Sequence, residues 1–583
     1  MVRGSTERLT SSRASRAPNL RPTRISSIGD TCTTRHGTYG WERMSAAARA
    51  SENAAANPRG AFQPGSSRRE QDWVTPPFAL HQRRSPQPFP QHVSPTATIL
   101  ADLQVDPGRI PAASRGSRRR QATDECHDGV RVLHAPGAAG APGCHLRGKG
   151  QPDRSAPTRS CGPRSMIGPG ATRELKLNKP LQEVRVGLVG AGNMGTNHVR
   201  SLARIPGAVV AAICDADEAN AEQARGIVTE AGHPAPTLYT RGERDFERLC
   251  GQEDLDLVYA TNPWEWHTAV CVTAMNHDKH AATEVPAAVT LEECWQLVET
   301  AERTGRQCII LENCCYDRVE LMVLNLVRRG LLGDLVHAEC GYMHDLRNEK
   351  LPDARTTPWR TQHSIRRNED LYPTHGVGPV AQCMNVNRGN RFSHLVSMST
   401  GSKGLNLFAA AKFGSDHPHA TRTYAVGDVV TTLIRTTAGQ TVVVKHDTNS
   451  PRPYSRDYFV QGTRGVVRKY PEEKIHIEGR SETKKWESLE GYAGEFAHPL
   501  WERLANQDSM DLGHGLMDYL VDYRVIQCLR AGGSPDIDVY DAATWSAISA
   551  LSGQSIADGS RPIAFPDFTR GRWKVRPPLG IVS

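Results

Sequence analysis

From residue 183 onward, short apolar runs alternate with longer segments in which apolar residues recur at the spacing of an amphipathic helix. Because apolar strands separated by helices are typical of a parallel sheet covered on both faces, we expect a doubly wound α/β domain. The apolar runs predict buried strands over residues 184–189, 209–214, 255–260, 281–283 and 307–311. The segments between them predict helices over 198–205, 268–276 and 291–304, and another helix that ends over 246–249.

Beyond residue 312 the pattern changes to strands joined by short turns. Two β-rich runs, 429–436 and 441–446, flank Thr-Ala-Gly-Gln at 437–440, which predicts a hairpin. Further strands are expected over 336–342, 394–399 and 458–462. We therefore expect an α+β domain with a mostly antiparallel, open-faced sheet and helices on one face. The predicted domains are 178–312 and 313–583.

The N-terminal segment shows neither pattern. Residues 1–170 contain 24 Arg and one Lys against 12 acidic residues, with much Ser, Pro, Gly and Ala. Such a composition buries too little apolar surface to offset the loss of chain entropy, so we expect residues 1–175 to be disordered. Many arginines with a single lysine are also expected if GC-rich DNA upstream of the gene is translated from an early start codon. In that case Met166 is the true start. An Arg-rich arm for targeting or nucleic acid is the alternative.

Charge and hydropathy exclude two classes of protein. The formal charge of the whole chain is +8, but residues 171–583 hold 46 basic and 51 acidic residues, so the excess belongs to the N-terminal segment. We therefore expect no nucleic-acid partner. No apolar run is long enough to span a bilayer, and none follows the paired arginines as in a signal peptide. We expect no membrane association and a cytoplasmic location.

A glycine-rich turn follows the first predicted strand. Gly190, Gly192 and Gly195 form G-x-G-x-x-G between this strand and a helix. The first glycine permits the tight turn, the second lets backbone amides approach a pyrophosphate, and the third allows close packing of helix on strand. Asp215 ends the next strand, where a carboxylate accepts hydrogen bonds from an adenosine ribose and repels a 2′-phosphate. The combination predicts NAD as the cofactor.

Polar and aromatic residues follow three later strands of the same domain. Ligands of a doubly wound sheet bind at the carboxyl ends of its strands, so these residues are expected to surround a nicotinamide ring. They are Asn-Pro-Trp-Glu-Trp-His at 262–267, Glu-Val-Pro at 284–286 and Glu-Asn at 312–313.

A Rossmann pattern that ends in Glu-x-Pro and precedes an α+β sheet domain resembles the Gfo/Idh/MocA oxidoreductases. Within that superfamily the chain is more similar to glycoside hydrolase family 109, the NAD-dependent α-N-acetylgalactosaminidases. The similarity extends from about residue 178 to 574. It is carried by the segments 264–267, 281–286, 337–342, 370–376, 427–432 and 451–456.

The resemblance implies which residues form the site. Besides the three glycines of the turn, NAD would be bound by Asn193, Met194, Asp215, Trp264, Glu265, Trp266, His267, Glu284, Val285, Asn313 and Tyr372. The sugar pocket would be lined by Tyr342, Arg360, Tyr372, Pro373, Thr374, His375 and Tyr454. Aromatic faces pack on sugar C–H groups, and Tyr, Arg and His side chains hydrogen-bond hydroxyl and acetamido groups. Tyr342 also fits a core position, and Arg360 a surface cation.

Val285 separates the candidate activities. Many sugar dehydrogenases of the superfamily have Glu-Lys-Pro at this point, with the lysine as a base or proton shuttle, and the hydrolases lack that lysine. Val285 transfers no proton, so the substitution favours a glycosidase. A conventional NAD-dependent sugar dehydrogenase is the alternative, and a catalytically silent sugar- or NAD-binding protein is the third.

The expected reaction is hydrolysis of terminal N-acetylgalactosaminides by oxidation, elimination, addition and reduction, with NAD recycled. Ordinary glycosidases place two carboxylates across the scissile bond, whereas the pocket segments offer tyrosine and histidine. We expect His375 and Tyr454 to be the acid–base residues, without assigning which acts at C2 or C3 of the sugar. No metal is expected, because His344 and Asp345 have no third ligand at a useful spacing. A homodimer is expected because related oxidoreductases pair through the open face of the sheet.

Overall fold

The computed structural model describes residues 179–504 and 514–581. The N-terminal part of this region is built on a parallel sheet of six strands in the order β3-β2-β1-β4-β5-β6. The strand order reverses between β1 and β4, the point at which a doubly wound sheet binds its ligand. The predicted α/β domain is confirmed. Its strands are β1 (Val184–Val189), β2 (Ala208–Cys214), β3 (Thr237–Tyr239), β4 (Leu257–Ala260), β5 (His280–Thr283) and β6 (Cys308–Ile310).

The helices between these strands begin where the sequence supplies a cap. Helix α1 begins at Asn193 with Gly192 as its N-cap, so the predicted span 198–205 was wrong at both ends. The glycine-rich turn itself starts this helix. Helix α3 begins at Phe246, where the apolar pattern had predicted a helix end. Helix α5 matches its prediction, because a Thr290–Glu293 capping box starts it and Gly305 ends it. The helices are α1 (Asn193–Leu202), α2 (Glu218–Glu230), α3 (Phe246–Gln252), α4 (Trp264–Asn276) and α5 (Leu291–Thr304).

The second part is a sheet of nine strands in the order β14-β13-β12-β11-β7-β10-β9-β8-β15. Its neighbours are antiparallel except β7 and β10, which are parallel. The predicted mostly antiparallel sheet and the hairpin at 437–440 are confirmed, but β12 to β15 were missed. Strands β14 and β15 have only two residues each, too few to show a period. The strands are β7 (Leu335–Met343), β8 (Phe392–Ser399), β9 (Val430–Thr436), β10 (Thr441–Asp447), β11 (Phe459–Gly462), β12 (Gly465–Arg468), β13 (Lys474–Ile477), β14 (Glu487–Ser488) and β15 (Ile563–Ala564).

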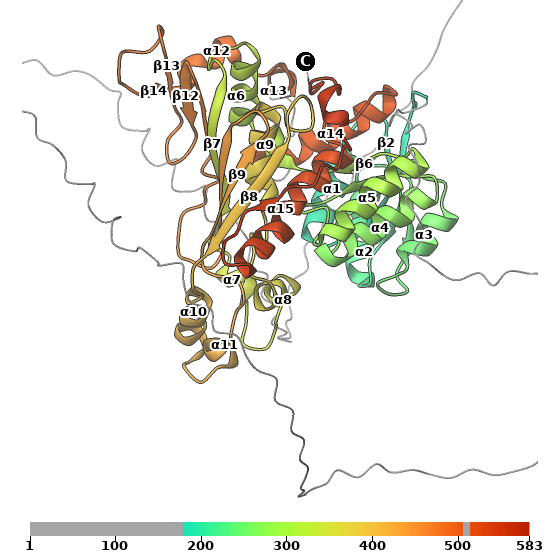
Figure 1. The fold of residues 1–583 in the computed structure, drawn as a ribbon. Helices are drawn as coiled ribbons and strands as arrows, with labels where there is room; N and C mark the ends of the chain where they lie inside the picture. Colours follow the sequence, from blue (N-terminus) through green and yellow to red (C-terminus); the bar gives the residue numbers. More distant parts are fainter. Residues whose placement is uncertain (1–178, 505–513, 582–583) are drawn as a thin grey trace, which may run out of the picture. The chain divides into compact units, whose positions relative to one another are not determined.

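One face of this sheet is covered and the other is open. Buried and exposed residues alternate along β9, with Leu433 on the exposed face. On the covered face, α9 (Thr374–Cys383) packs against β7 and α15 (Val539–Ala557) packs against β8. Figure 1 shows α15 between the strands of this sheet and helix α5 of the Rossmann domain. The predicted arrangement of helices on one face is therefore confirmed.

The C-terminal helices join the two sheets. Helix α14 (Met517–Arg530) packs against α1 and against the short helix η1 (Asn313–Tyr316), and α15 contacts both α5 and β6. Two carboxylates of α14, Asp518 and Asp522, are buried by this packing. The end of the chain thereby contributes charged groups to the region behind the carboxyl ends of the parallel strands.

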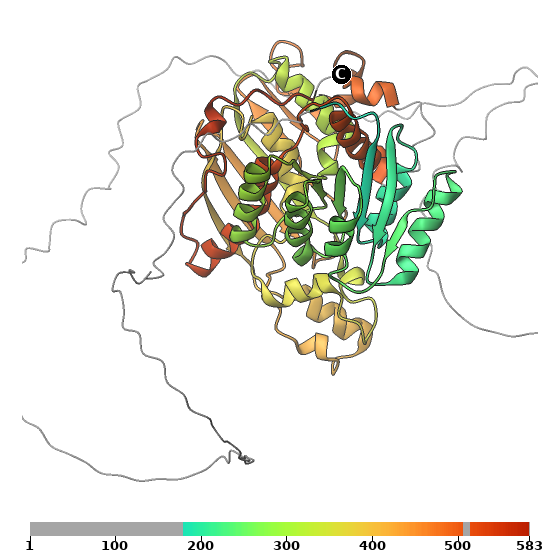
Figure 2. The same ribbon diagram turned by 90° about the vertical axis from the view of Figure 1, so that its right-hand side faces the viewer.

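The remaining helices lie around the nine-stranded sheet. Helices α10 and α11 lie at one end of it, away from α14 (Figure 1 and, turned by 90°, Figure 2). In the described part of the chain, no helix is long and apolar enough to cross a bilayer. The predicted disorder of residues 1–175 falls outside the described residues, and the domain boundaries remain predictions. The helices are α6 (Arg318–Arg328), α7 (Arg347–Lys350), α8 (Trp359–Arg366), α10 (Gly404–Phe413), α11 (Pro418–Thr421), η2 (Leu489–Tyr492), α12 (Ala493–Phe496), α13 (Pro499–Leu504), η3 (His514–Leu516) and η4 (Arg572–Lys574).

Candidate active site

The glycine-rich turn forms the floor of a cavity of about 520 Å³ beside the ends of β1, β2 and β4. Gly190 has a φ of +97°, and a Cβ there would lie 2.5 Å from the backbone nitrogen of Asn262. A Cβ on Gly195 would lie 1.8 Å from the carbonyl oxygen of Gly190. Helix α1 therefore lies so close to the turn that no side chain fits at residue 195. A Cβ on Gly192 would meet nothing within 4 Å. Gly190 and Gly195 thus meet the steric demands predicted for a dinucleotide-binding turn, and the role of Gly192 toward a pyrophosphate stays a prediction.

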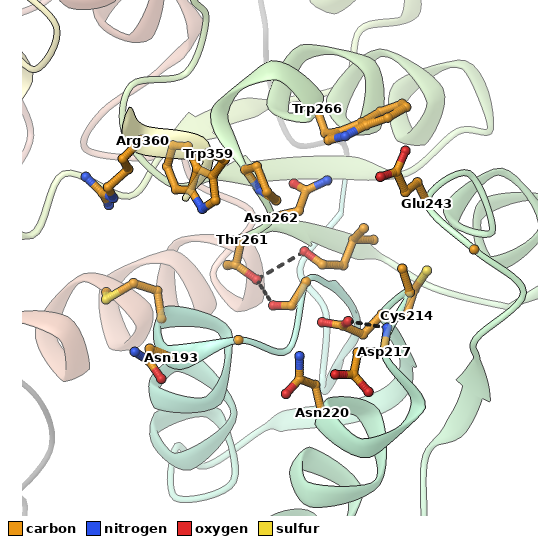
Figure 3. A pocket seen from close by; sticks show the side chains of 18 residues that line it. Asn193, Cys214, Asp217, Asn220, Glu243, Thr261, Asn262, Trp266, Trp359 and Arg360 are labelled. Carbon is orange, nitrogen blue, oxygen red and sulfur yellow. Dashed lines mark hydrogen bonds between the residues drawn. The ribbon is translucent and has the colours of Figure 1, made fainter. Parts of the chain in front are cut away.

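Figure 3 shows the two sides of this cavity. Asn193, Asp217 and Asn220 lie on one side, and Asn262 and Trp359 lie across from them. Six of the predicted cofactor residues line the cavity, namely Gly190, Gly192, Asn193, Met194, Asp215 and Trp266. Asn262, expected beside the nicotinamide ring, also lines the cavity. Lining residues that were not predicted are Asp217, Asn220, Glu243, Thr261 and Trp359.

Asp215 lies at the end of β2 with its carboxylate at the cavity. One carboxylate oxygen accepts a hydrogen bond from the backbone N–H of Ala191 (2.6 Å), and the other accepts one from Asp217 (2.8 Å). Each oxygen retains a lone pair for a ribose hydroxyl. The glycine cradle, the first turn of α1 and this carboxylate together fit an adenosine diphosphate moiety, so the residues present fit NAD.

Four aromatic side chains predicted for the sugar pocket are brought together from three distant segments. The ring of Tyr342, at the end of β7, lies 4.8 Å from that of Tyr372, 5.3 Å from that of His375 and 6.1 Å from that of Tyr454. We call Tyr342, Tyr372, His375 and Tyr454 the aromatic cluster. Tyr372 and Tyr342 are buried, whereas Tyr454 is 38% exposed. Burial raises the pKa of Tyr342 to about 12, so it remains a neutral hydroxyl group.

Arg360 of α8 joins the aromatic cluster to the cofactor cavity. Its guanidinium lies over the rings of Trp359 (4.8 Å), Trp264 (5.1 Å) and Tyr372 (5.4 Å). Arg360 lines the large cavity, and it also lines a second space of about 10 Å³ beside Tyr342 and Tyr372. Trp264 stacks on Tyr372 with ring centroids 5.3 Å apart. The predicted sugar residues therefore lie directly beside the predicted cofactor residues.

Two family profiles match the chain at these domains. Residues 184–311 match the family described as oxidoreductase family, NAD-binding Rossmann fold, and residues 316–575 match glycosyl hydrolase 109, C-terminal domain. A glycosyl hydrolase family 109 protein of Shewanella sp. (strain W3-18-1) is 44% identical over 406 residues, which cover 69% of this chain and 88% of that protein. The chain belongs to glycosyl hydrolase family 109. The predicted family is confirmed, and the protein is a glycoside hydrolase whose Rossmann domain binds NAD.

Other relatives agree with this assignment. A protein of Shewanella oneidensis (strain MR-1) named alpha-N-acetylgalactosaminidase is 43% identical over 408 residues, which cover 69% of this chain and 89% of that protein. Among solved structures, levoglucosan dehydrogenase in complex with NADH and levoglucosan has a TM-score of 0.52 at 19% identity, with 66% of this chain and all of that one covered. At that identity the likeness supports the fold alone.

Several other predicted residues of the hydrolase do not line the large cavity. His267 is buried, and its ring nitrogens lie 2.7 Å from the carbonyl oxygen of Asn262 and 2.8 Å from that of Pro286. It thereby ties the 262–267 segment to the Glu-Val-Pro loop, in which Val285 is also buried. Glu265 is half exposed and contacts His363. Pro373 caps α9, and the adjacent Thr374 is fully buried.

A buried histidine lies between two carboxylates behind the cofactor cavity. His198 of α1 is 2.9 Å from Asp522 of α14 through Nδ1 and 2.9 Å from the predicted NAD residue Glu284 through Nε2. Burial opposes the charged imidazole, but Asp522 and Glu284 together raise the pKa of His198 well above 6.5. Likewise, burial alone would raise the pKa of Glu284, yet the hydrogen bond from His198 lowers it. Asn313 contacts the same helix by donating to Asp518 (2.6 Å).

Tyr454 is held by an ion-pair network that the sequence analysis missed. Arg456 donates to the Tyr454 hydroxyl oxygen (3.0 Å) and to Glu320 (2.8 Å), and it also pairs with Asp317 (3.1 Å). Because the hydroxyl oxygen accepts from a cation, the O–H of Tyr454 is oriented to donate elsewhere. The Tyr-x-Arg spacing was the available signal, since residues i and i+2 of an extended segment lie on one side.

His375 belongs to a group of three residues whose side chains are of types that bind metal ions. Donor atoms of Glu312, Cys314 and His375 all lie within 4.8 Å of one another. This set differs from His344 and Asp345, the pair considered from the sequence, because it combines a strand end with helix α9. His344 instead contacts the Tyr342 hydroxyl through Nδ1 (3.0 Å), and burial lowers its pKa. The expectation that no metal is bound remains a prediction.

Asp215→Ala is expected to weaken NAD binding by about 1–3 kcal/mol, because a partly buried acceptor for the ribose is lost. Loss of the repelling carboxylate should also reduce the preference for NAD over NADP. Titration of NAD and NADP against the purified hydrolase, followed by fluorescence or calorimetry, measures both effects. Asp217→Ala is the matched control, since Asp217 lines the same cavity but caps α2. Equal NAD affinity in wild type and Asp215→Ala would contradict the assignment.

Proposed function

We propose that the hydrolase removes terminal N-acetylgalactosamine from glycosides by oxidation, elimination, addition and reduction, with NAD recycled. The supporting observation is the continuity of the two sites. Arg360 lines the cofactor cavity and its guanidinium lies 5.4 Å from the centre of the Tyr372 ring, so a sugar held by the aromatic cluster would lie next to the cofactor. The relative from Shewanella oneidensis carries the name alpha-N-acetylgalactosaminidase, which supports the substrate class.

The side chains around the proposed sugar position suit this route better than direct displacement. Direct displacement uses two carboxylates on either side of the scissile bond. Among the described residues of the aromatic cluster, the polar groups are two buried tyrosines, a histidine and the half-exposed Tyr454. The nearby Glu312 is fully buried and contacts His375 instead. Histidine and tyrosine supply a base and an acid without a carboxylate pair.

NAD, when bound, would accept the hydride of sugar C3 while a base takes the proton of the C3 hydroxyl, and it would later return the hydride as the C3 oxygen takes a proton back. A ketone at C3 acidifies the proton on C2, so His375, acting as a base, removes it and the C1–O bond breaks. The leaving oxygen takes a proton from an acid, for which Tyr454 is suited because Arg456 fixes its oxygen as an acceptor. Water then adds its oxygen to C1 and a proton to C2, which completes hydrolysis. Tyr342, Tyr372 and Arg360 position the ring.

The conventional sugar dehydrogenase remains the second candidate, and a silent sugar- or NAD-binding protein the third. Val285, at the position where dehydrogenases of the superfamily carry a lysine, is buried and carries no proton. Incubation with p-nitrophenyl α-N-acetylgalactosaminide distinguishes the three functions. Nitrophenol released without net NADH supports the glycosidase, and NADH formed in proportion to sugar supports the dehydrogenase. Absence of both signals across a panel of glycosides supports the third candidate.

The same incubation in D₂O tests the chemical route. We expect deuterium at C2 of the released N-acetylgalactosamine, because that proton exchanges with solvent after elimination. C3 should retain its original hydrogen, because the hydride returns from the cofactor. NMR of the product reports both positions. Sugar released without deuterium at C2 would mean direct displacement and would contradict the proposed mechanism.

The expected homodimer and cytoplasmic location are kept as predictions, as is the absence of a nucleic-acid partner. For the homodimer, the open face of the nine-stranded sheet is the proposed surface. Met398 of β8 is 65% exposed there and Leu433 of β9 is 48% exposed. Strands β8 and β9 are neighbours, and Val396 of β8 lies opposite Leu433. Met398 and Leu433 therefore lie on adjacent strands.

A further inference from the structure

Glu312 lies directly beneath the proposed catalytic histidine. Its side chain is fully buried, just beyond the end of β6, and Oε1 lies 2.6 Å from His375 Nδ1. The same oxygen accepts from the backbone N–H of Cys314 (3.1 Å). The other oxygen, Oε2, has no hydrogen-bond partner among the described residues. Burying a carboxylate with one oxygen unsatisfied is unfavourable, and the contact with His375 offers a reason for its presence here.

The packing of α9 places His375 over this carboxylate. Gly378 lies one turn after His375 and therefore on the same face of the helix. A Cβ on Gly378 would lie 3.0 Å from Cγ of Glu312 and 2.9 Å from Sγ of Cys315. The helix backbone therefore approaches Glu312 as closely as a glycine permits. This close approach fixes both the distance and the direction of the contact between His375 and Glu312.

A bound metal ion is the competing explanation for these groups. An ion about 2 Å from both Nδ1 and the carboxylate oxygen, in tetrahedral geometry, would hold those atoms about 3 Å apart or more. The observed 2.6 Å is the length of a charge-assisted hydrogen bond. The geometry favours a hydrogen-bonded pair.

We propose that Glu312 is a positioning residue that holds the proton of neutral His375 on Nδ1 and leaves Nε2 free to act as a base toward the sugar. The proposal rests on the proposed function of His375. When Nε2 takes a proton, the carboxylate faces an imidazolium, and the charge that forms is neutralised within the pair. This explains why a carboxylate is kept where no water reaches it. The pair Glu312–His375 therefore sets the tautomer of the base.

Two substitutions of Glu312 distinguish its effect on the tautomer of His375 from the effect of its negative charge. Glu312→Leu removes the acceptor, and we expect turnover to fall by about 10²–10⁴-fold. Glu312→Gln keeps the shape and one acceptor oxygen but loses the charge, so a smaller fall is expected. The Michaelis constant for the glycoside and the dissociation constant of NAD should change by less than about threefold. Asp536→Asn, which neutralises a buried carboxylate paired with Arg524 far from this pair in sequence, should leave turnover unchanged.

A second measurement is independent of activity. In protein labelled with [¹⁵N]histidine, with the His375 signals assigned by their loss in His375→Gln, neutral His375 should show a protonated Nδ1 and an unprotonated Nε2. Glu312→Leu should abolish this preference. An unchanged tautomer in Glu312→Leu, or unchanged turnover, would overturn the proposal. A stoichiometric metal in purified wild type that is lost in Glu312→Leu and Cys314→Ser would overturn it in favour of an ion site. If wild type releases no sugar while the tautomer behaves as expected, the proposed function alone fails.

Discussion

His375→Ala and Tyr454→Phe are each expected to lower the turnover of the hydrolase by about 10²–10⁴-fold, the usual contribution of one acid–base group. The two side chains come from different elements and both pack against Tyr342. His375 lies on α9 over Glu312, and Tyr454 lies in an extended segment with its oxygen fixed by Arg456. Neither lines the large cavity at the glycine-rich turn. We therefore expect NAD to bind both variants as tightly as it binds wild type.

Steady-state kinetics with a nitrophenyl glycoside, together with NAD titration, measure both quantities. His337→Ala and Tyr424→Phe are matched controls, because His337 lies in β7 beside Thr441 of β10 and Tyr424 contacts His419 near α11. Both controls should turn over at the wild-type rate. Turnover within about threefold of wild type in either site variant would remove that residue from the proposed acid–base roles. A parallel loss of NAD binding would indicate a folding defect instead.

His198→Leu is expected to lower the free energy of unfolding by about 3–5 kcal/mol, since removal of one partner leaves buried charges uncompensated. The charges are those of Asp522 and Glu284, each 2.9 Å from a ring nitrogen. His198 lowers the pKa of Glu284, whereas burial raises the pKa of Asp522 despite its contact with His198. Tyr259→Phe is the control, because it removes one hydrogen bond to Asp522 (3.1 Å) and keeps the cation, at a cost of about 0.5–1.5 kcal/mol. Denaturant unfolding of the NAD-free protein measures both. A loss below about 1 kcal/mol in His198→Leu would mean that the two carboxylates are not both ionised against His198.

The same histidine gives wild type a specific dependence on pH. Its folded pKa is raised well above 6.5, so below pH 6.5 the imidazole is protonated in both the folded and the unfolded chain and its contribution is fully present. As the pH rises above 6.5, the unfolded chain loses this proton first, and stability declines until the folded pKa is passed. His198→Leu should lack this decline. Glu284, whose pKa is lowered, contributes stability that is fully present above its unfolded pKa of about 4.5 and is lost only as the pH falls below that value.

The sequence by itself determined the cofactor domain and the class of site. Gly190 and Gly195 are readable from the sequence because each meets a steric demand that only glycine satisfies, as their positions relative to Asn262 and Gly190 show. Strands such as 184–189 and 441–446 were readable because burial on one or both faces dictates which residues are apolar. Short edge strands such as β14 were not, because two residues carry no period.

Only the tertiary structure decided which polar groups meet. His198 and Asp522 are 324 positions apart, and Glu312 and His375 are 63 apart, so no local pattern relates them. Their pairing follows from the packing of α14 on α1 and of α9 over the end of β6. Hydrophobic periodicity fixes which face of an element is buried, but the charge that a buried group carries depends on the groups that the fold places within about 3 Å of it. The sequence therefore identified His375 and Glu284 as candidates, and the fold determined what holds each of them.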